Sequence, residues 1–144
     1  MQSMSASWLP WALASAAFAA LTAIFGKVGV ANINADLATL VRTVVILATL
    51  AGIVSATGQW QAPASIAGRT WLFLALSGLA TGASWLCYFR ALQLGDASKV
   101  APVDKLSVVV VMALAAIFLG ESLTARHWLG GILIVSGAVL IAYA

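Results

Sequence analysis

Long apolar stretches alternate with short polar ones along the whole chain. A bilayer has a hydrocarbon core about 30 Å thick, and about 20 apolar residues in a helix cross it. Five stretches approach that length: residues 8–30, 36–57, 71–92, 98–119 and 126–143. The pattern predicts an all-α integral membrane protein with five transmembrane helices.

The polar stretches between these spans are short and carry Asn, Gly, Pro, Asp or Glu. Short connections make neighbouring helices antiparallel, and none is long enough to hold a soluble domain. We therefore expect residues 1–144 to form a single transmembrane domain.

Composition agrees with this prediction. Hydrophobic residues make up 63% of the chain and charged residues 8%, against roughly 25% charged residues in a soluble globular domain. The bilayer is therefore the main partner. The net charge of +3 comes from scattered single residues, so no clustered cationic face is available for nucleic acid.

The fourth span depends on where its helix begins. Its apolar part, residues 106–119, is too short to be an obvious span by itself. If the helix begins near Ser98, then Pro102, Asp104 and Lys105 lie within the bilayer, and Pro102 bends the helix. If Pro102 is instead the first helical residue, the span is just long enough and the two charges lie near its end.

The charges at the helix ends are nearly balanced between the two sides of the membrane. We call the N-terminal side A and the opposite side B. Arg69 and Arg126 fall on side A, and Lys27, Arg90 and Lys99 on side B. The positive-inside rule needs a clear excess of cations on one side, so the sequence is compatible with insertion in both orientations, that is, with dual topology.

Charged residues inside spans cost about 2.5 to 3.5 kcal/mol each at the bilayer centre, so they are candidates for function. Arg42 and Lys105 lie about 10 Å into their spans from side B. The full candidate set for a substrate path or gate is Lys27, Arg42, Arg90, Asp104 and Lys105, with Trp85 and Tyr88 as an aromatic wall. Alternatively, the long cationic side chains reach the headgroups and the aromatic residues only pack.

Small residues recur in the third and fifth spans. Gly78 and Gly82 have the spacing that lets helices approach closely, and Gly130 and Gly137 lie in the last span. We expect these glycines to serve helix packing.

Enzymatic chemistry finds no support in the sequence. The chain has one His and one Cys, and no set of residues has the spacing of metal ligands. Neither a G-x-S-x-G motif nor a phosphate-binding Gly-rich loop is present. We expect neither catalytic activity nor a cofactor nor a metal.

Several local motifs combine into a recognisable pattern: Tyr88-Phe89-Arg90-Ala91-Leu92 before a Gly loop, Ala97-Ser98 leading to Pro102, Leu119-Gly120-Glu121, and a last span with Gly130 and Gly137. Together they resemble the EamA-type repeat of the drug/metabolite transporter superfamily. The resemblance covers essentially the whole chain. Asp104-Lys105 departs from it, because members more often have uncharged residues there.

The resemblance implies a fold of two five-span repeats in inverted orientation, of which this chain holds one. A second, inverted copy or a related half-size partner would complete it, which the balanced charges permit. The implied function is a secondary transporter or exporter of small metabolites in a bacterial inner membrane. The excess of cations over anions among the candidate residues suggests anionic or zwitterionic solutes. Alternatives are a non-transporting subunit of a heteromeric complex and a component of a lipid-carrier flippase.

Overall fold

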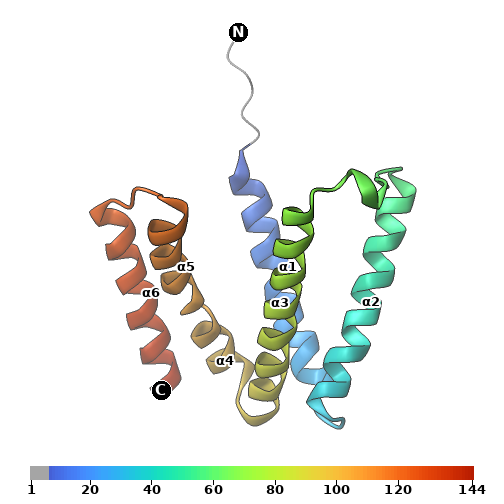
Figure 1. The fold of residues 1–144 in the computed structure, drawn as a ribbon. Coiled ribbons are helices and arrows are strands. Elements are labelled where there is room, and N and C mark those ends of the chain that lie inside the picture. The colour runs from blue at the N-terminus through green and yellow to red at the C-terminus, as the bar shows by residue number, and fades with distance from the viewer. Residues whose placement is uncertain (1–6) are drawn as a thin grey trace. The chain divides into compact units, whose positions relative to one another are not determined.

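A computed structural model describes residues 7–144, and these are almost entirely helical (Figure 1). The helices are α1 (Trp8–Gly29), α2 (Ala35–Ala56), α3 (Gly68–Leu94), α4 (Ala97–Asp104), α5 (Ser107–Leu114) and α6 (Ala125–Tyr143), with a 3-10 turn η1 (Pro63–Ser65) and a π-helix η2 (Ala115–Leu119). Five segments are long and apolar enough to cross a membrane. The predicted all-α fold with five spans is confirmed.

The helices begin and end close to the predicted bounds. The largest difference is in the third span, which begins at Gly68 rather than Trp71 and continues to Leu94. The fourth span runs from Ala97 to Leu119, but it is divided into α4, α5 and η2 rather than forming one helix. Its first part begins after Asp96, so Pro102 lies inside the helix and not at its start.

Local hydrogen bonds explain where several helices begin and end. The Asn34 side chain accepts from the backbone N–H groups of Asp36 and Leu37 at 2.8 and 3.2 Å, which caps the start of α2. At the start of α6, the Thr124 N–H donates to His127 Nδ1 at 3.0 Å. Gly120 ends η2 with a φ of 68°, a left-handed conformation that glycine adopts without steric cost.

Contacts divide the described residues into two compact units. Unit one contains residues 7–28 and 95–144, and unit two contains residues 29–94. That residues 1–144 act as a single domain stays a prediction.

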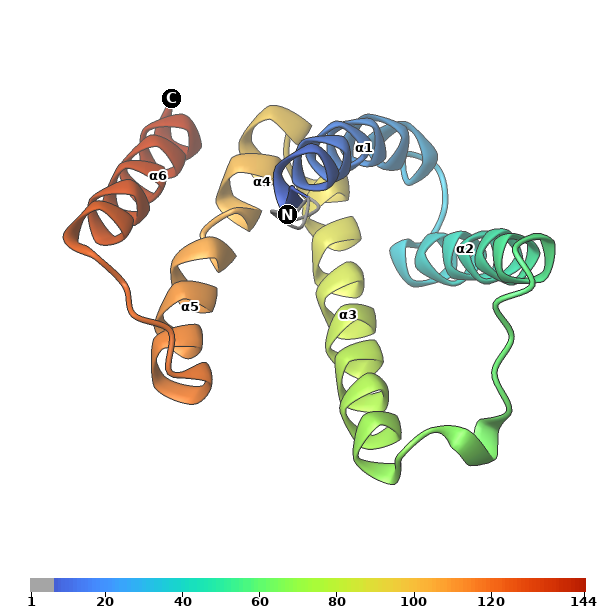
Figure 2. The ribbon, with the colours of Figure 1, turned by 90° about the horizontal axis from the view of Figure 1, so that it is seen from above.

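In unit two, α2 and α3 run antiparallel and pack against each other. They are closest where α2 begins and α3 ends, and they diverge toward the connection that holds η1 (Figures 1 and 2). The buried residues of this unit lie at the close end: Val30, Ala35, Ala38, Thr39, Phe89 and Leu92. Small residues on α2 thus admit the larger side chains of α3.

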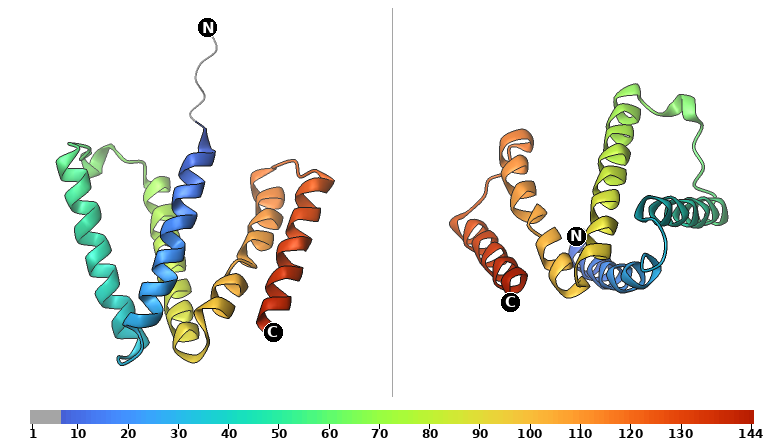
Figure 3. Two further views of the ribbon diagram at one scale, coloured as in Figure 1. Left: turned by 180° about the vertical axis from the view of Figure 1, so that it is seen from behind. Right: turned by 90° about the horizontal axis from the view of Figure 1, so that it is seen from below.

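In unit one, α6 packs against α4 and also contacts α5. Figure 3 shows α6 running back alongside the bent fourth span. A Cβ placed on Gly131 of α6 would lie 3.4 Å from Val109 and 3.6 Å from the sulfur of Met112. These are ordinary van der Waals distances, so α6 and α5 lie close together at Gly131.

We predict that Leu92→Ala strongly destabilises the chain, whereas Leu94→Ala does not. Leu92 is fully buried and Leu94 is 86% exposed, although both lie in the last turn of α3. A cavity left by a buried Leu costs about 2–5 kcal/mol, while an exposed site costs within about 0.5 kcal/mol. Denaturant titration in detergent micelles measures both variants, and equal destabilisation would contradict the packing described here.

Candidate functional site

The fourth span is broken at the point where it carries its charges. Pro102 has no N–H to donate to the carbonyl of Ser98. The Lys105 N–H donates to the carbonyl of Pro102 at 3.1 Å, and that of Leu106 to Val103 at 3.0 Å. Each of these hydrogen bonds joins a residue to the third residue before it, whereas an α-helix joins it to the fourth. The α-helix is therefore interrupted: α4 ends at Asp104 and α5 begins at Ser107. Figure 2 shows the two segments meeting at an angle.

The break also brings Asp104 and Lys105 together. Consecutive residues of a continuous helix point about 100° apart and do not face each other. Here Lys105 Nζ lies 3.4 Å from Asp104 Oδ2, with both side chains partly exposed. The arrangement places a charged pair about 11 Å into the span, counted from the start of α4.

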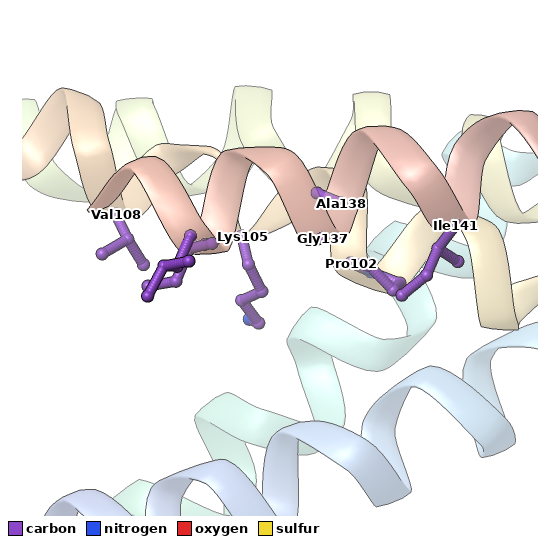
Figure 4. Close-up of a pocket in the computed structure, with 8 residues that line it drawn as sticks. Pro102, Lys105, Val108, Gly137, Ala138 and Ile141 are labelled. Carbon is purple, nitrogen blue, oxygen red and sulfur yellow. The ribbon is translucent and has the colours of Figure 1, made fainter. Parts of the chain in front are cut away.

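A groove lies beside this pair, between the fourth span and α6. Its volume is about 410 Å³. The residues that line it are Pro102, Lys105, Val108, Leu133, Ile134, Gly137, Ala138 and Ile141. Figure 4 shows the Lys105 side chain extended among them, with its nitrogen directed away from the helix backbone. Among these residues Lys105 supplies the only charge, so the groove is apolar with one cationic position.

Arg42 forms a second site, in unit two. Its guanidinium carbon lies 4.1 Å from the ring centre of Trp85 and 5.2 Å from that of Phe89. The half-buried Arg42 lies one turn beyond the last buried residue of α2, Thr39. Tyr88 adjoins the same cluster through an edge-to-face contact with Phe89 at 6.3 Å. A cation is therefore held against an aromatic surface where α2 and α3 begin to diverge.

Lys27 and Arg90 have partners of a different kind. Lys27 Nζ donates to the carbonyl of Gly95 at 2.8 Å, which ties the end of α1 to the turn before α4. Arg90 pairs with Asp36 at 3.1 Å, with side chains 62% and 55% exposed. An ion pair this exposed contributes only about 0–1 kcal/mol.

Three residues that make contacts in unit two were not among the predicted candidates. Asp36 is the partner of Arg90, Phe89 is the second ring beside Arg42, and Gln93 donates to the carbonyls of Ile33 and Val30 at 2.6 and 2.9 Å. The pairing of Asp36 with Arg90 could have been predicted, because both residues lie at side-B ends of adjacent antiparallel spans. The contacts of Phe89 and Gln93 depend on helix rotation, which a sequence does not give.

The predicted candidates fall into two groups. Arg42, Trp85, Tyr88 and Arg90 lie in unit two, whereas Lys27, Pro102, Asp104 and Lys105 lie in unit one. That they line one substrate path stays a prediction.

The packing role of the four glycines also stays a prediction. Nothing in the described chain lies within 4 Å of a Cβ placed on Gly78, Gly82, Gly130 or Gly137. The glycine of the last span that does approach another helix closely is Gly131.

The fold and these sites define a class: a five-span helical membrane protein with a broken, charged fourth span. The EamA-like transporter family matches residues 6–143. The chain therefore belongs to the EamA-like transporter family, and the predicted resemblance is confirmed.

Relatives agree with this assignment. A protein of Sinorhizobium sp. described as an uncharacterized transporter in the cobO 3' region is 68% identical over 139 residues, which are 96% of this chain and 99% of that protein. A probable 4-amino-4-deoxy-L-arabinose-phosphoundecaprenol flippase subunit ArnE of Yersinia pseudotuberculosis is 33% identical over 85 residues, 58% of this chain and 75% of that protein. Its counterpart in Yersinia pestis matches equally well. No solved structure matches the chain significantly.

We predict that Pro102→Ala repairs the helix around Lys105. An Ala at this position supplies an N–H for the Ser98 carbonyl and removes the ring that clashes with it. Hydrogen exchange of the amides of residues 104–108 should then slow several-fold in detergent micelles. Pro10→Ala, in the first turn of α1, is the matched control and should leave these amides unchanged. Unchanged exchange in Pro102→Ala would mean that the break does not depend on the proline.

Proposed function

We propose that this chain is one half of a secondary transporter for small metabolites that carry a negative charge or both charges. The observation that carries the proposal is the broken fourth span. Irregular backbone at membrane depth is tolerated where it is buried in protein or lines a water-filled cavity. Transporters use such breaks to build binding sites near the middle of the bilayer. Membership of the EamA-like transporter family supports this interpretation.

In this proposal the charged candidates act on the substrate. Lys105 and Arg42 bind or gate the substrate, and Asp104 holds Lys105 and takes part in proton coupling. Pro102 supplies the bend on which the path depends. Trp85 and Tyr88 form an aromatic wall beside Arg42, and Lys27 and Arg90 maintain the side-B ends of the helices.

A second, inverted copy completes the transporter. The near balance of cations at the helix ends permits both orientations. Trp71, Leu72, Phe73 and Leu79 of α3 are exposed in the chain by itself, which leaves apolar surface for the copy as well as for lipid. The assembly is then an antiparallel homodimer in a bacterial inner membrane, working by alternating access and without a cofactor or a catalytic step.

A heteromeric assembly is the second candidate. Relatives that share 33% identity are named as subunits of a flippase for a lipid-linked sugar. In that case this chain is a subunit that assembles with a different half-size partner, and the apolar groove beside Lys105 faces a lipid-linked ligand.

The topology of the chain separates the two candidates. We predict that a reporter active only in the cytoplasm and one active only outside it, each fused to the C-terminus, both give signal at comparable levels. Adding two Lys residues to the connection at residues 58–67, on side A, should shift the population to one orientation. A strictly single orientation of the unmodified chain would rule out the homodimer and leave the heteromer.

Transport by the purified chain tests the site residues. We predict that proteoliposomes containing it accumulate or release small organic anions, and that Lys105→Ala and Arg42→Ala each reduce the rate at least tenfold. Lys99→Ala is the matched control, because Lys99 is exposed in the first turn of α4. Flux that appears only after a second half-size protein is added supports the heteromer instead.

A further inference from the structure

We infer that Arg42, Trp85 and Phe89 form a recognition site for an organic oxyanion, a carboxylate or a phosphate attached to an apolar body. The inference deepens the proposed function, on which it rests, by assigning a ligand class to one of its sites. It rests on the N–H groups of the Arg42 guanidinium that do not pair with a carboxylate of the protein.

The guanidinium of Arg42 lies over an aromatic ring. Its carbon lies 4.1 Å from the centre of the Trp85 ring, within the range of a cation–π contact. In the stacked form of such a contact, the ring covers one face of the guanidinium. The five N–H donors lie in its plane and point outward from its edge, and this edge matches the two oxygens of a carboxylate or phosphate.

The carboxylate of unit two pairs with a residue other than Arg42. Among residues 29–94 the structure shows no carboxylate paired with Arg42, whose ring contacts are with Trp85 and Phe89. The carboxylate of this unit, Asp36, is occupied by Arg90 at 3.1 Å.

The neutral hydroxyl groups near Arg42 do not replace an anion. Those of Thr39 and Thr43 donate to carbonyls of their own helix at 2.8 and 2.7 Å. Tyr88 adjoins the cluster through its contact with Phe89, but it carries a phenol and not a carboxylate. The positive charge of the guanidinium therefore has no negative counterpart in unit two.

Negative charge is scarce over the whole chain. The chain has four acidic residues, Asp36, Asp96, Asp104 and Glu121. Asp36 is paired with Arg90, and Asp104 with Lys105 at 3.4 Å. Asp96 and Glu121 lie in connections between spans, whereas Arg42 lies about 10 Å inside α2.

A second, inverted copy does not supply the missing anion. Inversion exchanges the two sides, so side A of the copy lies where this chain has side B. The residues of the copy at the depth of Arg42 are therefore those about 10 Å from the side-A ends of its spans. These residues are uncharged in all five spans: Ser15, Thr49, Ala75, Met112 and Ile132. In this inference the negative charge that Arg42 lacks comes from a ligand.

The aromatic surroundings define the rest of the ligand. Phe89 is buried and Trp85 is half-buried, so part of the indole remains open beside the guanidinium. Leu86 on the next position of α3 is 41% exposed. A ligand that places its oxyanion on Arg42 therefore brings its remaining atoms against an apolar surface, which favours an organic anion over chloride.

The site is tested by calorimetric titration of the purified full-length chain in a neutral, chloride-free detergent buffer. The probes are benzoate and phenyl phosphate, with benzamide as the uncharged equivalent of benzoate and chloride as the simple anion. We expect saturable binding of at least one of the two organic anions, and none of benzamide. Chloride should bind at least tenfold more weakly.

The variants assign this binding to Arg42. Arg42→Lys retains the charge but loses the planar fork and its stacking, so the affinity for the organic anion should fall at least tenfold. Arg42→Gln should abolish binding. Arg69→Lys is the matched control, because Arg69 also lies over a ring, Phe73 at 5.7 Å, but is exposed in the first turn of α3. Size-exclusion profiles and circular dichroism establish that each variant is folded.

Three binding results would overturn the inference: no saturable binding of either organic anion, unchanged binding in a folded Arg42→Gln variant, or chloride binding as tight as that of the organic anions. Flux measured on the same preparations separates this site from the proposed function. Binding without flux, both for this chain alone and with a second half-size protein added, upholds the site and removes the transporter. Flux that is unchanged in Arg42→Lys removes the site and leaves the transporter.

Discussion

The hydrocarbon core of a bilayer contains no water to pair with polar groups, and the structure of this chain depends on that constraint. Backbone groups inside the membrane must bond within the protein, which is why nearly every described residue lies in a helix. The same constraint makes each exception informative. The clearest exceptions are the break between Asp104 and Ser107 and the cations inside the spans.

The break can be traced to a few residues. Pro102 removes one helical hydrogen bond, and the next turn closes through shorter bonds to Pro102 and Val103. The charged pair that follows lies beside a groove built from α6, where Gly137 and Ala138 leave room. One imino acid and two small residues on the facing helix thus accompany a cationic position in an otherwise apolar groove.

The cations inside or near the spans are satisfied in different ways, and the differences assign them different roles. Lys27 bonds to a backbone carbonyl, Arg90 to a carboxylate on the neighbouring helix, and Lys105 to the residue before it. Arg42 is held mainly by aromatic side chains within its unit. Because a stacked ring covers only the face of a guanidinium, the edge of Arg42 is the place where we infer that a ligand binds.

The sequence by itself determined the five spans, their order and the family, because the length of an apolar run and the position of turn residues are local properties. It also identified Arg42, Asp104 and Lys105 as charged residues within or at the end of predicted spans. It could not determine that Asp36 pairs with Arg90, that Phe89 joins Trp85 beside Arg42, or that Gly131 rather than Gly130 meets α5. Those contacts depend on the rotation of each helix about its axis and on the angle at which two helices meet. Only the packing of side chains in the tertiary structure decides these quantities, because in spans that are apolar on every side the sequence pattern does not single out one face.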